Sequence, residues 1–278
     1  MLDPNSRLPP SGIAGFADVD GAADPRAYIA FLDAFQRSLA PMIESGIDLL
    51  DLKAGASVLD VGCGHGAVFG RLAARLGSGG RLVGIDSSRT LLAEARRRCE
   101  GERCAIELHE SDAHRLPFAD ATFDATRADR LLIFLHDPAA ALAEMVRVTR
   151  PGGRIVVTES DLGSAVVDAP DADLTRTLLA TAAEAVRGGW IGRRLKRLFA
   201  ESGLHGIEVR IFNAPSTDFG EWRRRMGRDP AAERAVALGR ADALAVDAWR
   251  GELQSRDTAG RFFAVSSFFM ASATRPPA

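Results

Sequence analysis

Three glycines at alternate positions stand directly after a short apolar run that ends in an acid. Residues 58–66 read VLDVGCGHG, with Asp60 two positions before the first glycine. Because glycine has no Cβ, such a loop can turn sharply and let a ligand lie against its backbone. The start of a following helix favours a negative group. The stretch is therefore a candidate binding loop for a ligand that contains a nucleoside.

Two further acids stand at the ends of later apolar runs. Asp86 closes RLVGID at 81–86, twenty residues past the last glycine of the loop, and Asp112 follows AIELHE at 105–110. A carboxylate at the first position can accept both ribose hydroxyls, and a hydrogen bond to a charged acceptor contributes about 1.5–3 kcal/mol. A carboxylate at the second can accept from the exocyclic amine of adenine.

The spacing of the glycines distinguishes between two nucleoside ligands. The dinucleotide fingerprint is GxGxxG, whereas this loop reads GxGxG and continues with Ala67 and Val68. Asp60, treated as uncompensated, would repel a pyrophosphate and attract the ammonium and sulfonium groups of S-adenosylmethionine. A nicotinamide-dependent oxidoreductase is therefore the weaker alternative.

The elements that must position these residues follow an alternating pattern. Short apolar runs alternate with stretches of helical spacing between 57 and 157, which predicts a parallel sheet covered on both faces. The DSS at 86–88 suits a helix N-cap. The predicted strands are 57–61, 81–86, 105–110, 123–128, 154–160, 207–212 and 261–273.

Four segments in this order resemble the class I S-adenosylmethionine-dependent methyltransferases, in particular the branch with the ubiquinone and menaquinone biosynthesis enzymes. They are VLDVGCGHG, GIDSS, SDAHRLPFADATFD and RVTRPGGRIVVTE, within about residues 55–160. The resemblance implies an α/β fold, a Rossmann-like doubly wound sheet of seven strands with the last one antiparallel. It also implies S-adenosylmethionine as cofactor and S-adenosylhomocysteine as product.

The same resemblance implies which residues hold the cofactor. The loop would line the methionine end, the second acid the ribose and the third acid the adenine. The residues are Asp60, Gly62, Cys63, Gly64, Gly66, Asp86, Ser87, Ser111, Asp112, Ala113 and Asp129. Taken singly, the three acids also fit ordinary roles as helix caps or turn residues.

Helical patterns outside the core predict a cover for a small substrate. We expect an N-terminal helical cap over 1–50 and a methyltransferase domain over 51–278, with lid insertions near 162–188 and 216–256. Core packing explains the aromatic candidates equally well. The substrate-binding candidates are Tyr28, Arg130, Phe134 and Trp190, with Phe16 and Trp222 as further wall residues.

A catalytic base is harder to predict. Many relatives carry a histidine in an LxH segment, but RLLIFLHDP at 130–138 has Phe134 at that position and His136 two residues later. Methyl transfer depends mainly on alignment, so a base is optional. His136 and Asp161 are the catalytic candidates, and local capping or ion pairing explains both as well. A repurposed protein that binds the cofactor without transfer is the main alternative.

Composition excludes several classes of partner. A formal charge of −2 gives no attraction to nucleic acid or to a membrane, and the Asp/Asn-Pro-Pro-aromatic segment of enzymes that hold a flipped base is missing after 123–128. Five histidines without a ligand pair argue against a metal. Three cysteines, no leader-like N-terminus and no long apolar window predict a cytoplasmic protein. We expect a small molecule as partner and allow for a homodimer.

Overall fold

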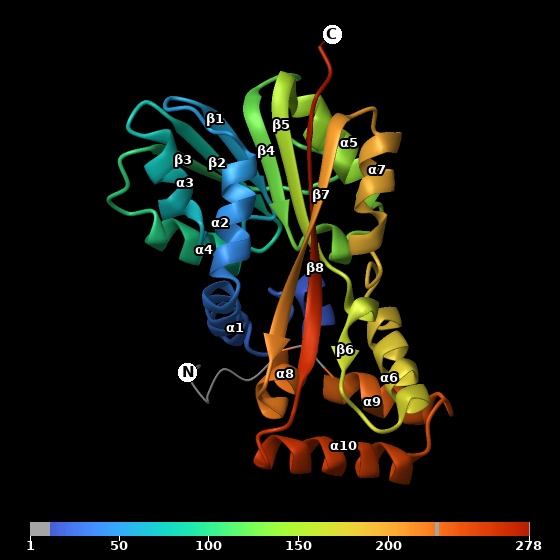
Figure 1. Ribbon diagram of the computed structural model, residues 1–278. Coiled ribbons are helices and arrows are strands. Elements are labelled where there is room, and N and C mark those ends of the chain that lie inside the picture. The colour runs from blue at the N-terminus through green and yellow to red at the C-terminus, as the bar shows by residue number, and fades with distance from the viewer. Residues whose placement is uncertain (1–11, 226–227, 278) are drawn as a thin grey trace.

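Five parallel strands form the centre of the molecule. The computed structural model describes residues 12–225 and 228–277. Strand β1 pairs with β2 on one side and β4 on the other, β2 pairs with β3, and β4 pairs with β5, so that their carboxyl ends share one edge (Figure 1). The strands are β1 Ser57–Val61, β2 Arg81–Asp86, β3 Ala105–Glu110, β4 Phe123–Asp129 and β5 Thr149–Ser160.

A long antiparallel pair extends the sheet. β8 (Ala264–Thr274) runs antiparallel to β5, and β7 (His205–Ser216) pairs with β8 along its other side. The short β6 (Val166–Val167) pairs with the start of β8 and makes the sheet eight-stranded. The predicted α/β fold with one antiparallel strand among parallel ones is therefore confirmed, and β6 is an addition to the seven predicted strands.

Successive side chains of each strand point to opposite faces of the sheet, and helices cover the apolar side chains on both faces. Val58 faces a core with residues of α2 and α3, whereas Leu59 faces the core below α5 and α7. α2 lies close to β5 and β8, since Gly46 allows Met270 to approach. The helices are α2 Ala40–Leu49, α3 Phe69–Leu76, α4 Arg89–Arg98, α5 Pro138–Val148 and α7 Leu195–Glu201.

Strands β7 and β8 continue past the parallel strands into a second lobe (Figure 1). Phe219, Trp222, Trp249 and Phe262 pack together there, and the indole of Trp249 donates a 2.9 Å hydrogen bond to Thr175. The helices of this lobe are α6 Ala172–Glu184, α8 Phe219–Arg225, α9 Arg228–Ala237 and α10 Ala243–Thr258. Among the helices described, none combines the length and apolarity of a membrane span.

The N-terminal segment folds as a short 3-10 helix, η1 (Gly12–Ala17), followed by α1 (Pro25–Ser38). Asp24 caps α1 by accepting from the backbone N–H groups of Arg26 and Ala27. Of the predicted cap over 1–50, the described part contains η1, α1 and α2 joined by short turns, and its first eleven residues lie outside the described part. The domain boundaries themselves stay predictions.

Candidate functional site

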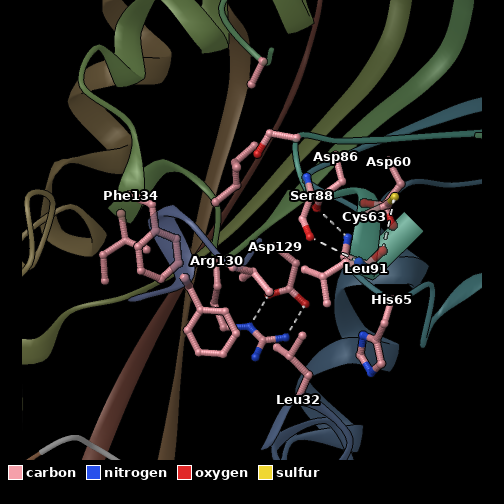
Figure 2. A pocket seen from close by; sticks show the side chains of 18 of the residues that line it. Leu32, Asp60, Cys63, His65, Asp86, Ser88, Leu91, Asp129, Arg130 and Phe134 are labelled. Atoms are coloured by element: carbon pink, nitrogen blue, oxygen red, sulfur yellow. Dashed lines mark hydrogen bonds and ion pairs between the residues drawn. The ribbon is translucent and has the colours of Figure 1, made fainter. Parts of the chain in front are cut away.

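A cavity of about 560 Å³ opens at the carboxyl ends of β1, β2 and β4. Figure 2 shows Asp60 and Asp86 on one side of it and Phe134 on the other, with Asp129 and Arg130 between them. This is the edge at which a doubly wound sheet binds its ligands.

Two of the three glycines in the loop after β1 leave no room for a side chain, each for a different reason. All three glycines have positive φ, of 70°, 55° and 72°. A Cβ on Gly62 would lie 2.8 Å from the side chain of Leu131, which lines the cavity. A Cβ on Gly66 would lie 3.1 Å from Ala95 of α4. Gly62 therefore keeps the site open, and Gly66 permits close packing of a helix.

Asp86 braces the loop from the end of β2. Its carboxylate accepts from the backbone N–H of Gly64 at 2.8 Å and from that of Ser88 at 2.9 Å. Burial raises its pKa, and these backbone bonds oppose the shift. Ser88 in turn caps α4 through its hydroxyl, which accepts from Leu91 N–H, as the DSS pattern predicts.

Asp112 follows β3, so that Asp60, Asp86 and Asp112 form a row of acids across the neighbouring strands β1, β2 and β3. The Oδ1 of Asp112 accepts from both the backbone N–H and the ring Nδ1 of His114, at 2.9 and 2.6 Å. The backbone bond from His114 contributes most to a lowered pKa of this carboxyl. The His114 ring stacks on His136 with centroids 3.9 Å apart. Oδ2 lies outside these bonds and is the oxygen left to accept from a ligand.

Four charged side chains form a network between β1 and β4. Arg127 stands opposite Asp60 in the sheet register and donates to it at 2.8 Å, and it reaches Asp129 at 3.4 Å. Arg130, with φ of 56°, forks onto both oxygens of Asp129 at 2.9 and 3.1 Å. The electrostatic premise that Asp60 is uncompensated was therefore wrong.

The network divides the roles of its two acids. Burial raises the pKa of Asp60 to about 6 in spite of Arg127, and its Oδ1 has no hydrogen-bond partner within the described chain. Burial also opposes ionisation of Asp129, but Arg130 and Arg127 hold the pKa of that carboxyl below its usual value. Asp60 consequently retains one free oxygen, whereas both oxygens of Asp129 already accept from arginine.

The roof of the cavity comes from the N-terminal segment. Phe16 of η1 contacts Phe31 of α1 and Phe134 of the loop after β4 at centroid distances of 5.6 and 6.0 Å. Asp20 fastens this segment to α4, because its carboxylate accepts from the Ser88 hydroxyl and from the backbone N–H groups of Arg89 and Thr90 at 2.7, 2.7 and 3.1 Å. The roof is therefore tied to the helix beside the glycine loop.

A buried glutamate supports the other wall. Glu159 accepts from the backbone N–H of Leu132 at 2.5 Å, at the start of the turn that carries Phe134. Burial raises its pKa to about 8. This side chain does not line the cavity, so it acts on the shape of the wall from behind.

Comparison with known proteins agrees with this geometry. The methyltransferase domain family matches residues 58–153. A 37.1 kDa protein of transposon Tn4556 from Streptomyces fradiae is 39% identical over 83% of this chain and 66% of its own. A demethylmenaquinone methyltransferase of Desulfitobacterium hafniense is 34% identical over 41% of this chain and 46% of its own.

A solved methyltransferase from Bacillus halodurans superposes with a TM-score of 0.60 at 19% identity, over 84% of this chain and 98% of that one. The chain carries a class I S-adenosylmethionine-dependent methyltransferase domain. S-adenosylmethionine is the cofactor of such a domain. The chain spans between 42% and 66% of the length of several curated relatives that it matches.

The site of this methyltransferase domain fits its cofactor. Asp60 Oδ1 and Gln36 Oε1 are buried acceptors with no partner in the described residues, and both residues line the cavity, where a protonated amine could meet them. Asp86 and Asp112 line the same cavity, and both are acceptors of the kind that ribose and adenine groups need. A Cβ on Gly62 would narrow this cradle.

Most predicted cofactor residues line the cavity of the methyltransferase domain, and Gly66 is the exception because it packs against Ala95. The lining ones are Asp60, Gly62, Cys63, Gly64, Asp86, Ser87, Ser111, Asp112, Ala113 and Asp129. Phe16, Arg130 and Phe134 also line it, as the predictions for the substrate wall require.

Four other predicted residues do not reach the cavity. Tyr28 is fully buried behind Phe16, and Trp190 lies under the guanidinium of Arg193 at 4.5 Å. Asp161 is bound at both oxygens by Arg193, at 2.8 and 2.7 Å, and His136 stacks on His114. The two catalytic candidates, His136 and Asp161, therefore have local structural partners.

The predicted lids are also placed differently. Trp222 belongs to the core of the second lobe, and no described residue of 216–256 lines the cavity. Only Leu162 does so within 162–188. Helices α6, α8, α9 and α10 pack around the far ends of β7 and β8 (Figure 1), and their buried side chains continue the core that lies on the α5 and α7 face of the sheet.

Sequence reasoning missed several lining residues of the methyltransferase domain. Arg127 gave a usable signal, since an arginine inside a buried parallel strand requires a carboxylate partner. The helical spacing of Phe31 and Phe35 pointed to packing, and only the fold turns them toward the cavity. The missed residues include Phe31, Leu32, Phe35, Gln36, Arg127, Leu131 and Ile133.

Proposed function

We propose that this chain is an active S-adenosylmethionine-dependent methyltransferase whose acceptor is a small molecule with an apolar ring, methylated on oxygen or carbon. One observation carries the proposal: a single cavity joins a row of acids to an aromatic wall. The wall consists of Phe16, Phe31, Phe35 and Phe134, which come from three separate elements.

The protein's contribution would be alignment. When bound, the cofactor supplies an electrophilic methyl group on a sulfonium, and its thioether leaves without needing a proton. Asp86 and Asp112 fix the nucleoside, the glycine loop admits the methionine end, and the aromatic wall holds the acceptor and excludes water. Holding two reactants in line is worth effective molarities of about 10⁵–10⁸ M.

The acceptor class rests on two supports. One relative is named a demethylmenaquinone methyltransferase, which supports a quinol-like ring. Phe134 stands where many relatives carry a histidine, which supports an apolar wall at that point. A cytoplasmic location rests on three cysteines, all within the described residues and none in a disulfide. A homodimer stays a proposal without support from contacts.

The direct test is transfer of a labelled methyl group from S-adenosylmethionine to a panel of phenols, quinols and naphthols. We expect labelled product with at least one ring-bearing acceptor. Tight binding of S-adenosylhomocysteine with no transfer to any acceptor would favour a repurposed cofactor-binding protein instead.

Two glycine variants provide a matched control. Gly62 and Gly152 have φ values of 70° and 76°, so alanine strains the backbone similarly at both positions. A Cβ at Gly152 meets no atom within 4 Å, whereas one at Gly62 meets Leu131. We expect Gly62→Ala to lose cofactor binding and Gly152→Ala to retain transfer.

A further inference from the structure

A continuous chain of ring contacts ends at a guanidinium group inside the cavity. Phe134 contacts Phe16, which contacts Phe31, and Phe31 stacks on Phe35 at 5.6 Å. The guanidinium of Arg130 lies over the ring of Phe35 at 4.9 Å. All five side chains line the cavity, so the acceptor space has aromatic walls and one cationic end.

Arg130 has a donor nitrogen that its partner in the protein does not use. It uses Nε and Nη2 for the fork onto Asp129, which leaves Nη1 outside that pair. Asp129 also accepts from Arg127 at 3.4 Å, but the nearer partner of Arg127 is Asp60 at 2.8 Å, so the network holds two acids and two arginines. What Arg130 offers a second anion is the pair of N–H groups on Nη1, which can make a charge-assisted hydrogen bond.

The remaining ionisable side chains of the cavity already have protein partners. Asp60, Asp86, Asp112 and Asp129 are bound as described above, His65 pairs with Asp33 at 3.0 Å, and Glu110 receives Arg89 at 2.8 Å. Those carboxylates lie along the nucleoside side or are paired with arginine. An acceptor that has already lost its proton to solvent needs no base from this set.

We propose that Arg130 selects acceptors that combine a flat aromatic ring with an anionic oxygen, a carboxylate or a phenolate, with the ring against the aromatic wall and the oxygen toward Nη1. This inference rests on the proposed function and names its substrate class. Arg130 is the specificity-determining residue of this cavity, and Phe134 forms the apolar wall against which the acceptor ring lies.

The test measures binding of three probes of the same shape to protein saturated with S-adenosylhomocysteine. The probes are 2-naphthoate, 2-naphthamide and 2-naphthylmethylammonium, titrated by calorimetry at pH 7.5. We expect the carboxylate to bind at least about tenfold more tightly than the amide and the ammonium to bind most weakly. Equal binding of carboxylate and amide, or no binding of any probe, would overturn the inference.

Arg130 variants assign the preference to this residue. In Arg130→Gln the carboxylate and amide should bind within about twofold of each other, and Arg130→Lys should keep part of the preference. Each variant is saturated with S-adenosylhomocysteine according to its own titration. A preference that survives in Arg130→Gln would contradict the assignment, and if that variant does not fold, the wild-type ranking and the lysine variant decide.

The measurement is independent of methyl transfer. If the ranking holds but no acceptor is methylated, the proposed function fails and the selectivity of the cavity stands. If transfer occurs but anionic and neutral acceptors bind alike, only the role of Arg130 fails.

Discussion

Replacing Asp86 by asparagine removes the charge that links the glycine loop to the start of α4. The carboxylate accepts from Gly64 N–H at 2.8 Å and Ser88 N–H at 2.9 Å, one bond to each oxygen. Asparagine keeps one acceptor oxygen and turns an NH₂ group toward the other N–H. The variant therefore loses one loop contact and the charge that would accept from the ribose.

The size of the effect follows from these bonds. A hydrogen bond to a charged acceptor contributes about 1.5–3 kcal/mol, and about 1.4 kcal/mol corresponds to a tenfold change in Kd. Loss of one such bond to the ribose predicts that Asp86→Asn binds S-adenosylhomocysteine about ten- to hundredfold more weakly. Calorimetric titration at pH 7.5 measures this change.

Asp124 provides the matched control because it makes the same kind of bond at the opposite edge of the sheet. Its Oδ2 accepts from Ser57 N–H at 2.6 Å, where β1 begins, and it does not line the cavity. Asp124→Asn should lower stability in urea without changing the affinity for S-adenosylhomocysteine. Wild-type affinity in Asp86→Asn would refute the reasoning and leave Asp86 as a loop brace alone.

Three further outcomes follow from single contacts. Asp20→Ala should speed release of S-adenosylhomocysteine about threefold to tenfold in stopped flow, because it frees the roof from α4 and its exposed bonds are partly screened. Gly66→Ala should lower the free energy of unfolding by about 1–3 kcal/mol, since its φ is 72° and Ala95 lies 3.1 Å from the new Cβ. Glu159 has a pKa raised to about 8, so the wild type should lose stability relative to Glu159→Gln as pH rises from 4.5 to 8. The expected loss in the free energy of unfolding, measured in urea, is up to about 1.4 kcal/mol per pH unit. The unfolded chain ionises there while the native glutamate stays protonated.

Each outcome has a control in the same region. Asp18→Asn alters only a turn bond to Gly21 and should leave release unchanged. Gly101→Ala has positive φ with open space around its Cβ, so a loss equal to that of Gly66→Ala would show that Ala95 is irrelevant. Glu144 has a lowered pKa, chiefly because Arg147 donates to it, so the wild type should gain stability relative to Glu144→Gln as pH rises toward 4.5 and show no such change between 4.5 and 8.

The local pattern of the sequence was sufficient for the parallel core. Apolar runs of strand length separated by helical periods define each element within its own residues, and Asp60, Asp86 and Asp112 mark strand ends by position alone. Because carboxyl ends of parallel strands meet at one edge, placing the elements also placed these acids together. The acidic lining at this end of the cavity was therefore predictable.

Tertiary structure alone decided what faces the acceptor. Phe31 and Phe35 have the same helical spacing as core residues, and whether they line the cavity, with Phe35 against Arg130, depends on where α1 crosses the sheet edge. Trp222 and Trp190 were reasonable wall candidates by residue type. Trp222 is instead buried in the hydrophobic core away from the cavity, and Trp190 packs against the guanidinium of Arg193. Contacts between segments far apart in the chain leave no periodic signal, so the choice between wall and core is made only when the elements pack.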